Sequence, residues 1–186
     1  MSIDKEYQEH LRKEHDGSKW GTTGDKYSGD WVRRILRDRP YIQSVLDYGA
    51  GKGTLGRAIT GINEWVDYDP GVPEIDTLPN RRFDMVVSTD CLEHVEPTHI
   101  EAVIAQIGSR AGKVVALDIP CYETGSKFME GPYLGEDMHL IVKPPKWWKM
   151  MTDKYLTDFQ LFSMETIEKL SKGQYKERVR LIYERL

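Results

Sequence analysis

A short run of glycines after an apolar segment is the part of this sequence best suited to bind a ligand. Residues 45–53 read VLDYGAGKG, with Gly49, Gly51 and Gly53 at alternate positions. Glycines after a strand let a ligand lie against bare backbone at the carboxyl edge, where open α/β sheets bind ligands. Asp47 precedes the first glycine by two residues, so its carboxylate is expected to face the same crevice. A positively charged ammonium group is the natural partner for that carboxylate.

A second frame of the same glycines gives a competing prediction. Residues 51–56 read GKGTLG and satisfy G-x-G-x-x-G, the dinucleotide-binding fingerprint, and Asp69 lies 18 residues beyond Gly51. This frame places Asp47 and Gly49 inside the buried first strand, where an unpaired carboxylate is costly. We therefore favour the first frame. The dinucleotide frame and a purely structural strand–turn–helix stay open as alternatives.

Strands and helices alternate around this loop. Apolar runs predict strands at residues 44–47, 64–67, 83–88 and 113–120. Helices are predicted at residues 4–14, 30–38, 98–107 and 145–155, with another beginning near residue 54. A closing antiparallel pair is predicted at residues 159–163 and 178–183, with a weak helix between them at residues 165–170. The alternation indicates a parallel sheet in a three-layer α/β domain.

Length and composition exclude several classes of protein. The chain has 186 residues, 39% hydrophobic and 30% charged, which fits one domain and excludes wholesale disorder. No apolar run approaches a membrane span and the polar N-terminus lacks a secretory signal, so a cytoplasmic protein with no membrane partner is expected. Two cysteines, Cys91 and Cys121, cannot form a disulfide framework or a zinc site by themselves, and we expect no metal site.

Charge is distributed unevenly along the chain. Residues 41–142 hold 16 acidic and seven basic side chains, net −9, whereas residues 1–40 are net +1 and residues 143–186 are net +4. An acidic middle argues against a phosphate-binding groove through the centre. It favours a central ligand that is cationic or that is held by carboxylates.

Four segments, in order, resemble one enzyme superfamily. VLDYGAGKG resembles motif I of class I S-adenosylmethionine-dependent methyltransferases, with the [D/E]-x-G-x-G-x-G pattern complete. FDMVVSTDCLEHVEP resembles the fourth-strand segment of that superfamily, particularly its small-molecule branch. GKVVALDIP resembles the fifth strand and HLIVKPPKWW the histidine-containing stretch after it. The resemblance covers about residues 40–160 and implies a Rossmann-like methyltransferase fold: a mostly parallel sheet with an antiparallel closing strand.

The resemblance implies S-adenosylmethionine as the cofactor and assigns roles to the glycine loop. Asp47 and Gly49 would hold the methionine amine. Gly51 and Gly53 would let the cofactor approach the loop backbone. The same four residues were selected above from spacing alone, so the two lines of reasoning meet at this loop.

The region after the second predicted strand departs from the superfamily pattern. The superfamily places a helix and a third strand here, but only residues 68–82 are available, so we expect the third-strand region to be reduced. The resemblance assigns the ribose hydroxyls to an acid at the end of the second strand, whose two oxygens match a vicinal diol. Asp67 and Asp69 both qualify, and we lean to Asp69. Asp76 most resembles the adenine-contacting position.

The resemblance also assigns residues to the reacting end of the cofactor, at the tip of the fourth strand of the superfamily pattern, and to the substrate wall at the segment that begins with His139. Asp90 and Cys91 would lie beneath the sulfonium and the methionine arm. Methyl transfer is an in-line displacement that needs a base only when the acceptor carries a proton of high pKa. His139 is favoured for a direct role and His94 is the second candidate, with His99 less favoured.

These observations predict one methyltransferase domain over residues 1–186. Residues 1–40 would form an N-terminal lid or helical extension, residues 41–120 the cofactor-binding half and residues 121–186 the substrate-side half. The expected partner is a small or modest polar acceptor molecule. The oligomeric state is left open.

Two alternatives to this function are kept. A nucleotide or nucleic-acid methyltransferase is possible because the C-terminal part is basic, although a nucleophilic Cys121 lacks a companion motif and is disfavoured. A catalytically degenerate S-adenosylmethionine-binding module is the alternative outside catalysis. Residues 20–27 and 122–139 carry aromatic residues among glycines, and we expect both segments to be irregular lids.

Overall fold

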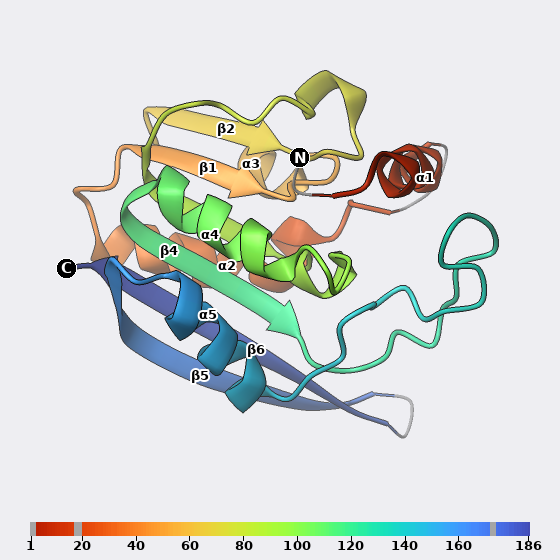
Figure 1. Cartoon of the computed structure of the whole chain (residues 1–186). Coiled ribbons are helices and arrows are strands. Elements are labelled where there is room, and N and C mark those ends of the chain that lie inside the picture. Colours follow the sequence, from red (N-terminus) through yellow and green to blue (C-terminus); the bar gives the residue numbers. More distant parts are fainter. Residues whose placement is uncertain (1–2, 17–19, 172–173) are drawn as a thin grey trace.

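The fold is built on one six-stranded sheet (Figure 1), which we describe from a computed structural model covering residues 3–16, 20–171 and 174–186. The strand order is β2-β1-β3-β4-β6-β5. The strands are β1 (Ser44–Tyr48), β2 (Glu64–Tyr68), β3 (Phe83–Thr89), β4 (Ala111–Pro120), β5 (Phe159–Ser171) and β6 (Gln174–Arg185). β2, β1, β3 and β4 pair in parallel, and β6 runs antiparallel to both β4 and β5. The predicted α/β fold with a mostly parallel sheet and an antiparallel closing strand is confirmed.

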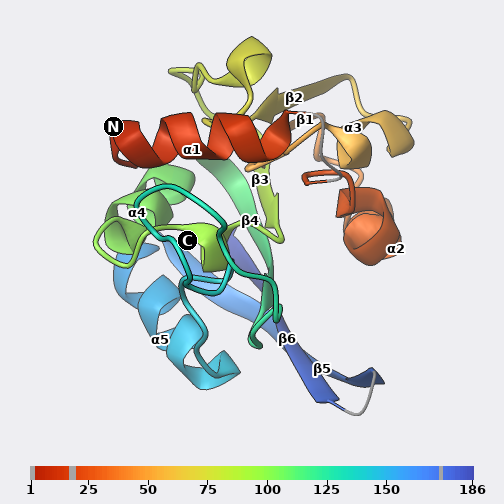
Figure 2. The ribbon, with the colours of Figure 1, turned by 90° about the vertical axis from the view of Figure 1, so that its right-hand side faces the viewer.

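Helices cover both faces of the sheet, and one helix crosses the carboxyl ends of its parallel strands. They are α1 (Lys5–His15), α2 (Gly24–Asp38), α3 (Thr54–Ala58), α4 (Ile100–Arg110) and α5 (Pro145–Tyr155), with short 3₁₀ turns η1 (Pro73–Ile75) and η2 (Leu92–His94). α4 and α5 pack on one face, and α2 and α3 pack on the other. α1 crosses the carboxyl edge of the parallel strands, onto which Figure 2 looks.

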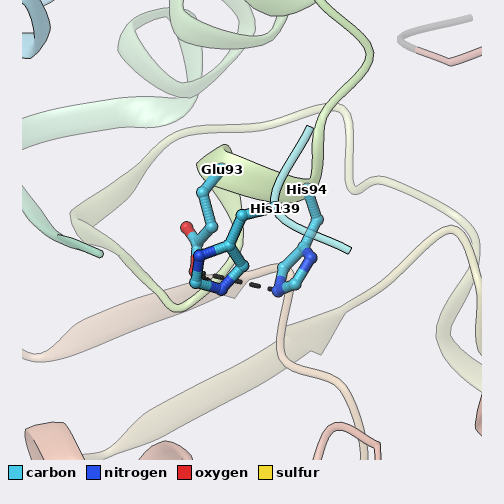
Figure 3. A group of neighbouring side chains, drawn as sticks. All are labelled: Glu93, His94 and His139. Carbon is cyan, nitrogen blue, oxygen red and sulfur yellow. Dashed lines mark ion pairs between the residues drawn. The ribbon is translucent and has the colours of Figure 1, made fainter. Parts of the chain in front are cut away.

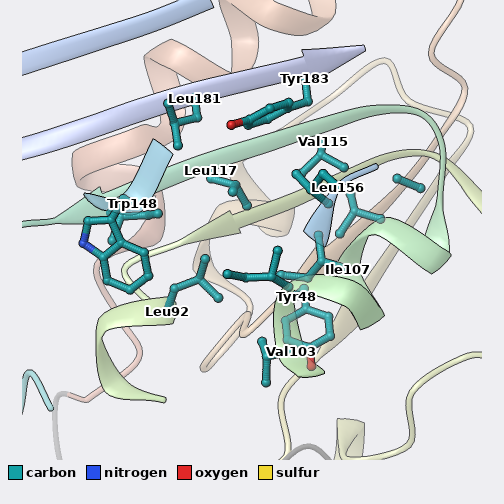
Figure 4. Close-up of a cluster of buried hydrophobic side chains, with 14 of the residues drawn as sticks. Tyr48, Leu92, Val103, Ile107, Val115, Leu117, Trp148, Leu156, Leu181 and Tyr183 are labelled. Atoms are coloured by element: carbon teal, nitrogen blue, oxygen red, sulfur yellow. The ribbon is translucent and has the colours of Figure 1, made fainter. Parts of the chain in front are cut away.

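Alternation along β4 explains how one sheet serves two cores. Val115 and Leu117 belong to the cluster beneath α4 and α5, where Trp148 is fully buried (Figure 4). Val114 and Ala116 belong to the cluster on the opposite face, beneath α2. Successive side chains of a strand point to opposite faces, so a strand covered on both faces is apolar at every position. This arrangement leaves the carboxyl ends of the strands as the place where polar side chains gather.

The reduced third-strand region is present as expected. Between β2 and β3 the chain forms only turns and the single 3₁₀ turn η1. β1 therefore pairs directly with β2 on one side and β3 on the other.

Two local predictions were wrong. Residues 165–170 form strand rather than helix, because β5 continues through them and each residue pairs with β6, for example Glu165 with Arg180. α2 begins at Gly24, earlier than expected, so only residues 20–23 of the first predicted lid lie outside a helix. A Cβ at position 24 would lie 3.2 Å from the Leu55 Cβ, so a glycine here lets the helix start close against α3.

Among the described residues, no helix combines the length and apolar character needed to cross a membrane.

Candidate active site

A cavity of about 300 Å³ lies where the parallel strands end, under α1. The glycine loop after β1, the turn after β3 and the loop between β4 and α5 all contribute to its walls. Of the residues selected from the sequence, the lining includes Asp47, Gly49, Gly51, Asp69, Asp90, Cys91, His94 and His139. The structure therefore brings both ends of the predicted site to one cavity.

The loop after β1 leaves no room for a side chain at Gly49 or Gly51. Gly49 has φ +80°, and a Cβ there would lie 2.1 Å from the Cys91 Sγ. A Cβ on Gly51 would lie 2.5 Å from the backbone of Gly21, whose carbonyl accepts a hydrogen bond from the Lys52 amide at 2.8 Å. The glycines thus admit the protein's own chain as well as a ligand. Gly53 precedes α3 and is not part of the cavity lining.

Asp47 is a buried carboxylate without a hydrogen-bond partner for one of its oxygens. The residue is 2% exposed, and its Oδ1 has no partner among the described residues. Burial, with the nearby charges of Asp67 and Asp69, raises the pKa of this carboxyl well above its usual range. An acceptor of this kind at a cavity wall fits an ammonium group, which would supply both charge and hydrogen bonds.

The two competing acids at the end of β2 occupy different surroundings. Asp69 lines the cavity and accepts hydrogen bonds from the amides of Gly51 and Gly71, each at 2.8 Å. Burial raises the pKa of Asp69, while His15, whose Nε2 lies 3.8 Å away, opposes that rise. Asp67 accepts from the Trp65 indole at 2.8 Å and is not in the lining.

Asp76 also lies outside the lining. Its carboxylate pairs with the Arg12 guanidinium of α1 at 2.7 Å. This pair ties the loop between β2 and β3 to the N-terminal helix.

The turn after β3 is held by charge pairs. Asp90 has φ +48°, unusual for a residue with a side chain, and its carboxylate accepts from Arg178 at 3.0 Å. Arg178 also donates to Asp118 at 2.8 Å. Burial raises the pKa of the Cys91 thiol and raises that of Cys121 to about 12, so neither is a thiolate near neutral pH.

The opposite wall of the cavity carries two histidines, with a buried glutamate behind them (Figure 3). His94, in η2, and His139, in the loop before α5, have ring centroids 4.9 Å apart. Each ring places its Nε2 near Glu93 Oε1, at 3.7 Å and 3.8 Å respectively. Burial lowers the pKa of His94 to about 3 and also lowers that of His139, so both rings are neutral near pH 7.

Sequence reasoning missed Glu93, although it is the neighbour of a selected histidine. The Glu93 side chain is fully buried, and burial raises its pKa well above the usual range. The only signal was the Glu-His pair within the CLEHV run, which carries no indication of burial.

The N-terminal segment forms part of the cavity wall. Tyr7 of α1 donates a hydrogen bond from its hydroxyl to the His94 carbonyl at 2.7 Å. Trp20 packs on the His94 ring with centroids 4.8 Å apart, and both Trp20 and His15 line the cavity. From the second predicted lid, Thr124 joins His139 in the lining. Neither His15 nor Tyr7 was selected from the sequence, because nothing local links α1 to the turn after β3.

Comparison with known proteins gives a family and a set of similar folds. A model of the family described as "Methyltransferase domain" matches residues 13–172. No curated protein matches at a significant level.

Three solved structures illustrate the similarity of fold. The 1,6-didemethyltoxoflavin-N1-methyltransferase of Burkholderia thailandensis, with S-adenosylhomocysteine bound, has TM-score 0.65 and 13% identity over 96% of this chain and 87% of that chain. The N-methyltransferase NodS of Bradyrhizobium japonicum, also with S-adenosyl-L-homocysteine, has TM-score 0.60 and 10% identity over 98% and 99%. The magnesium protoporphyrin IX methyltransferase of Synechocystis, with SAM bound, has TM-score 0.56 and 17% identity over 98% and 92%.

Proposed function

This chain belongs to the methyltransferase domain family, and we propose that it transfers a methyl group from S-adenosylmethionine to a small polar acceptor held in the cavity under α1. One observation carries the proposal: the buried Asp47 Oδ1 at the cavity wall, which has no hydrogen-bond partner in the part of the chain that the structure describes, beside a loop with no room for a side chain at Gly49 or Gly51. A cofactor with an ammonium and a sulfonium group supplies the positive charge that this wall lacks. Two of the similar structures contain S-adenosylhomocysteine and the third contains SAM, which supports S-adenosylmethionine as the cofactor here.

The cofactor contacts follow from the lining. Asp47 and the backbone at Gly49 would hold the methionine amine, and Gly51 would lie against the cofactor. Asp69 is favoured over Asp67 for the ribose hydroxyls, because Asp69 lines the cavity. Each Asp69 oxygen already accepts one backbone amide. A carboxylate oxygen accepts more than one hydrogen bond, so capacity for the ribose diol remains.

The reaction itself depends on position and on exclusion of water. Methyl transfer would be an in-line displacement on the sulfonium methyl, and Trp20 and residues of α1 form part of the cavity wall that would position the reactants. Asp90 and Cys91 would lie beneath the methionine arm. His94, with a pKa of about 3, is poorly matched to proton abstraction near neutral pH.

His139 stays our proposal for direct contact with the acceptor. Its Nδ1 lies 2.5 Å from the Tyr122 carbonyl, and a carbonyl oxygen only accepts, so Nδ1 carries the proton. The Nε2 lone pair is thus available at the cavity. A neutral imidazole in this state can take a proton from the acceptor or bind a cation that the acceptor contacts.

Calorimetry with S-adenosylhomocysteine, S-adenosylmethionine and NAD tests the cofactor. We expect each of the two adenosyl compounds to bind with a stoichiometry of one molecule per chain, and we expect NAD not to bind. Tight binding of NAD without binding of either adenosyl compound would overturn the proposal. Salt-dependent binding of an RNA or DNA oligonucleotide, with no small acceptor methylated, would instead favour a nucleic-acid substrate.

A further inference from the structure

Three side-chain atoms that carry lone pairs converge beside the cavity. Glu93 Oε1 lies 3.7 Å from His94 Nε2 and 3.8 Å from His139 Nε2, and the three atoms lie within 4.8 Å of one another. Figure 3 shows the two rings and the carboxylate facing a common point. Both distances from Glu93 to the rings are too long for a direct hydrogen bond.

The protonation of the rings is determined by their other nitrogens. His94 Nδ1 lies 2.7 Å from the Met138 carbonyl oxygen, and His139 Nδ1 lies 2.5 Å from that of Tyr122. A carbonyl oxygen has no proton to donate, so each Nδ1 must be the donor. A neutral ring protonated at Nδ1 presents a lone pair at Nε2, and both Nε2 atoms face Glu93.

Glu93 has no other partner that would explain its burial. Its side chain is fully buried, and neither carboxylate oxygen has a hydrogen-bond partner among the described residues. The nearby Arg178 is already paired with Asp90 and Asp118, at 3.0 Å and 2.8 Å. Among the described residues, Glu93, His94 and His139 thus face one another without a direct hydrogen bond between the carboxyl and either ring, an arrangement that a cation, on displacing any carboxyl proton, would stabilise.

We propose that Glu93, His94 and His139 bind a divalent transition-metal cation. Two imidazoles and a carboxylate form a ligand set suited to Zn²⁺ or a similar ion, and three protein ligands leave a position for a substrate or water. Ligand atoms about 2.1 Å from a tetrahedral zinc lie about 3.4 Å apart, so small side-chain movements suffice to close this set. The Nδ1 hydrogen bonds to backbone carbonyls are the contacts that orient metal-binding histidines.

The sequence did not predict this site. Two cysteines are too few for a cysteine-based zinc site, and His139 lies 45 residues beyond His94. Only the return of the loop before α5 to η2, through the Ile141 amide bonded to the Glu93 carbonyl at 2.9 Å, brings the ligands together.

A cation here would select the acceptor, a consequence that rests on the proposed function. His94 and His139 line the same cavity as the residues placed under the methionine arm, and the His94 side chain is 20% exposed. An acceptor with an ionisable oxygen fits, because contact with a divalent cation lowers the pKa of a hydroxyl. The acceptor proton leaves to solvent and its oxygen bonds to the methyl carbon. The S–CH₃ bond breaks with its electron pair remaining on sulfur.

Metal binding is tested on the whole chain after treatment with a chelator. Zn²⁺ is titrated by calorimetry, and Co²⁺ is titrated by its visible absorption. We expect one cation to bind tightly per chain. The visible absorption bands of bound Co²⁺ should be intense, as is typical of a cobalt ion with a low coordination number. His94→Ala and His139→Ala should each weaken Zn²⁺ binding at least about tenfold.

His99→Gln is the matched control, because His99, with Asp4 and Glu96, forms the second carboxylate–histidine group of the described chain. We expect His99→Gln to bind Zn²⁺ as the wild type does. Loss of binding in this control, with binding kept in the His94 and His139 variants, would overturn the proposal. Absence of stoichiometric binding in the wild type would also overturn it.

X-ray absorption of the zinc-loaded wild type keeps the proposal testable even when a variant fails to fold. Two imidazole ligands and an oxygen ligand are expected, and fewer than two imidazoles would contradict the site. S-adenosylhomocysteine binding is measured on the same metal-free protein. Cofactor binding without zinc binding removes only this inference, whereas zinc binding without cofactor binding removes only the proposed function.

Discussion

The two ends of the cavity are built in opposite ways. At the glycine-loop end, Asp47, Gly49 and Gly51 come from five consecutive residues at the tip of one strand. At the histidine end, Glu93 and His139 come from separate loops and meet only because the chain returns across the strand tips. One end is local in sequence, and the other is assembled by the fold.

The electrostatics of the two ends also differ. Among the described residues, the glycine-loop end presents one carboxylate oxygen without a hydrogen-bond partner, beside backbone that leaves no room for a side chain at Gly49 or Gly51. The histidine end presents three potential ligand atoms within 4.8 Å of one another. A single buried acceptor fits an ammonium group, whereas three converging acceptors fit a metal ion. We therefore propose two separate positions for positive charge. The ammonium group of the cofactor would lie at the glycine-loop end, and the metal ion that contacts the acceptor would lie at the histidine end.

The largest expected effect is a loss of stability on substitution of Gly49, which tests how tightly the glycine-loop end is packed. In Gly49→Ala the new Cβ would lie 2.1 Å from the Cys91 Sγ and the residue would keep a φ of +80°. We expect a loss of about 3 kcal/mol or more in the free energy of unfolding, measured by urea denaturation.

Gly61→Ala is the matched control for that substitution. Gly61 has φ +83°, but a Cβ there would meet nothing within 4 Å. The backbone cost alone should be about 1 kcal/mol. Equal losses in the two variants would mean that contact with Cys91 does not restrict the loop.

The second prediction separates binding from stability at Asp47. Asp47→Asn removes the charge that the ammonium group needs, so S-adenosylhomocysteine affinity should fall about 10- to 100-fold by calorimetry. Asp67→Asn, on the neighbouring strand but outside the lining, should change the affinity less than about threefold. A large loss in Asp67→Asn would move the ribose contact from Asp69 to Asp67.

The third prediction concerns how the stability of the ligand-free protein depends on pH through the Asp47 carboxyl. Burial raises the pKa of Asp47 in the folded chain. A group with a raised folded pKa stabilises the fold fully below its unfolded pKa of about 4, and this stabilisation is lost as pH rises toward the folded pKa. The unfolding free energy of the wild type should therefore fall relative to Asp47→Asn as pH rises from about 4 to 7, by at most about 1.4 kcal/mol per unit. Parallel pH profiles of the two proteins would contradict an unpartnered Asp47.

The sequence predicted the glycine-loop end because its geometry is local. A strand followed by alternate glycines fixes where Asp47 and Gly49 lie, and the carboxyl ends of parallel strands meet at one edge of the sheet. The alternation of strands and helices predicted the architecture for the same reason. Asp69 could be selected because the resemblance places an acid at the end of the second strand, and Asp69 stands where the following turn begins.

The histidine end and the C-terminal hairpin could not be predicted in the same way. Residues 165–170 look weakly helical in isolation, and only pairing with β6 makes them a strand. Glu93 is recognisable as a site residue only once the loop carrying His139 is seen to lie against it. Tertiary contacts between distant segments decide both cases, and no local pattern reports them.

The smallest expected effect is that of substituting Asp76, in the loop between β2 and β3 next to the glycine-loop end. Asp76 lies outside the cavity lining, and its pair with Arg12 is partly exposed, with side chains 28% and 39% accessible. Asp76→Asn should cost less than about 1 kcal/mol of stability, since exposed ion pairs contribute little, and should change S-adenosylhomocysteine affinity less than about twofold. Asp69→Asn, whose carboxylate lines the cavity, should weaken the same affinity about tenfold. Equal losses in the two variants would show that the adenine end of the cofactor reaches the loop between β2 and β3, and the local end of the site would then extend beyond the strand tips.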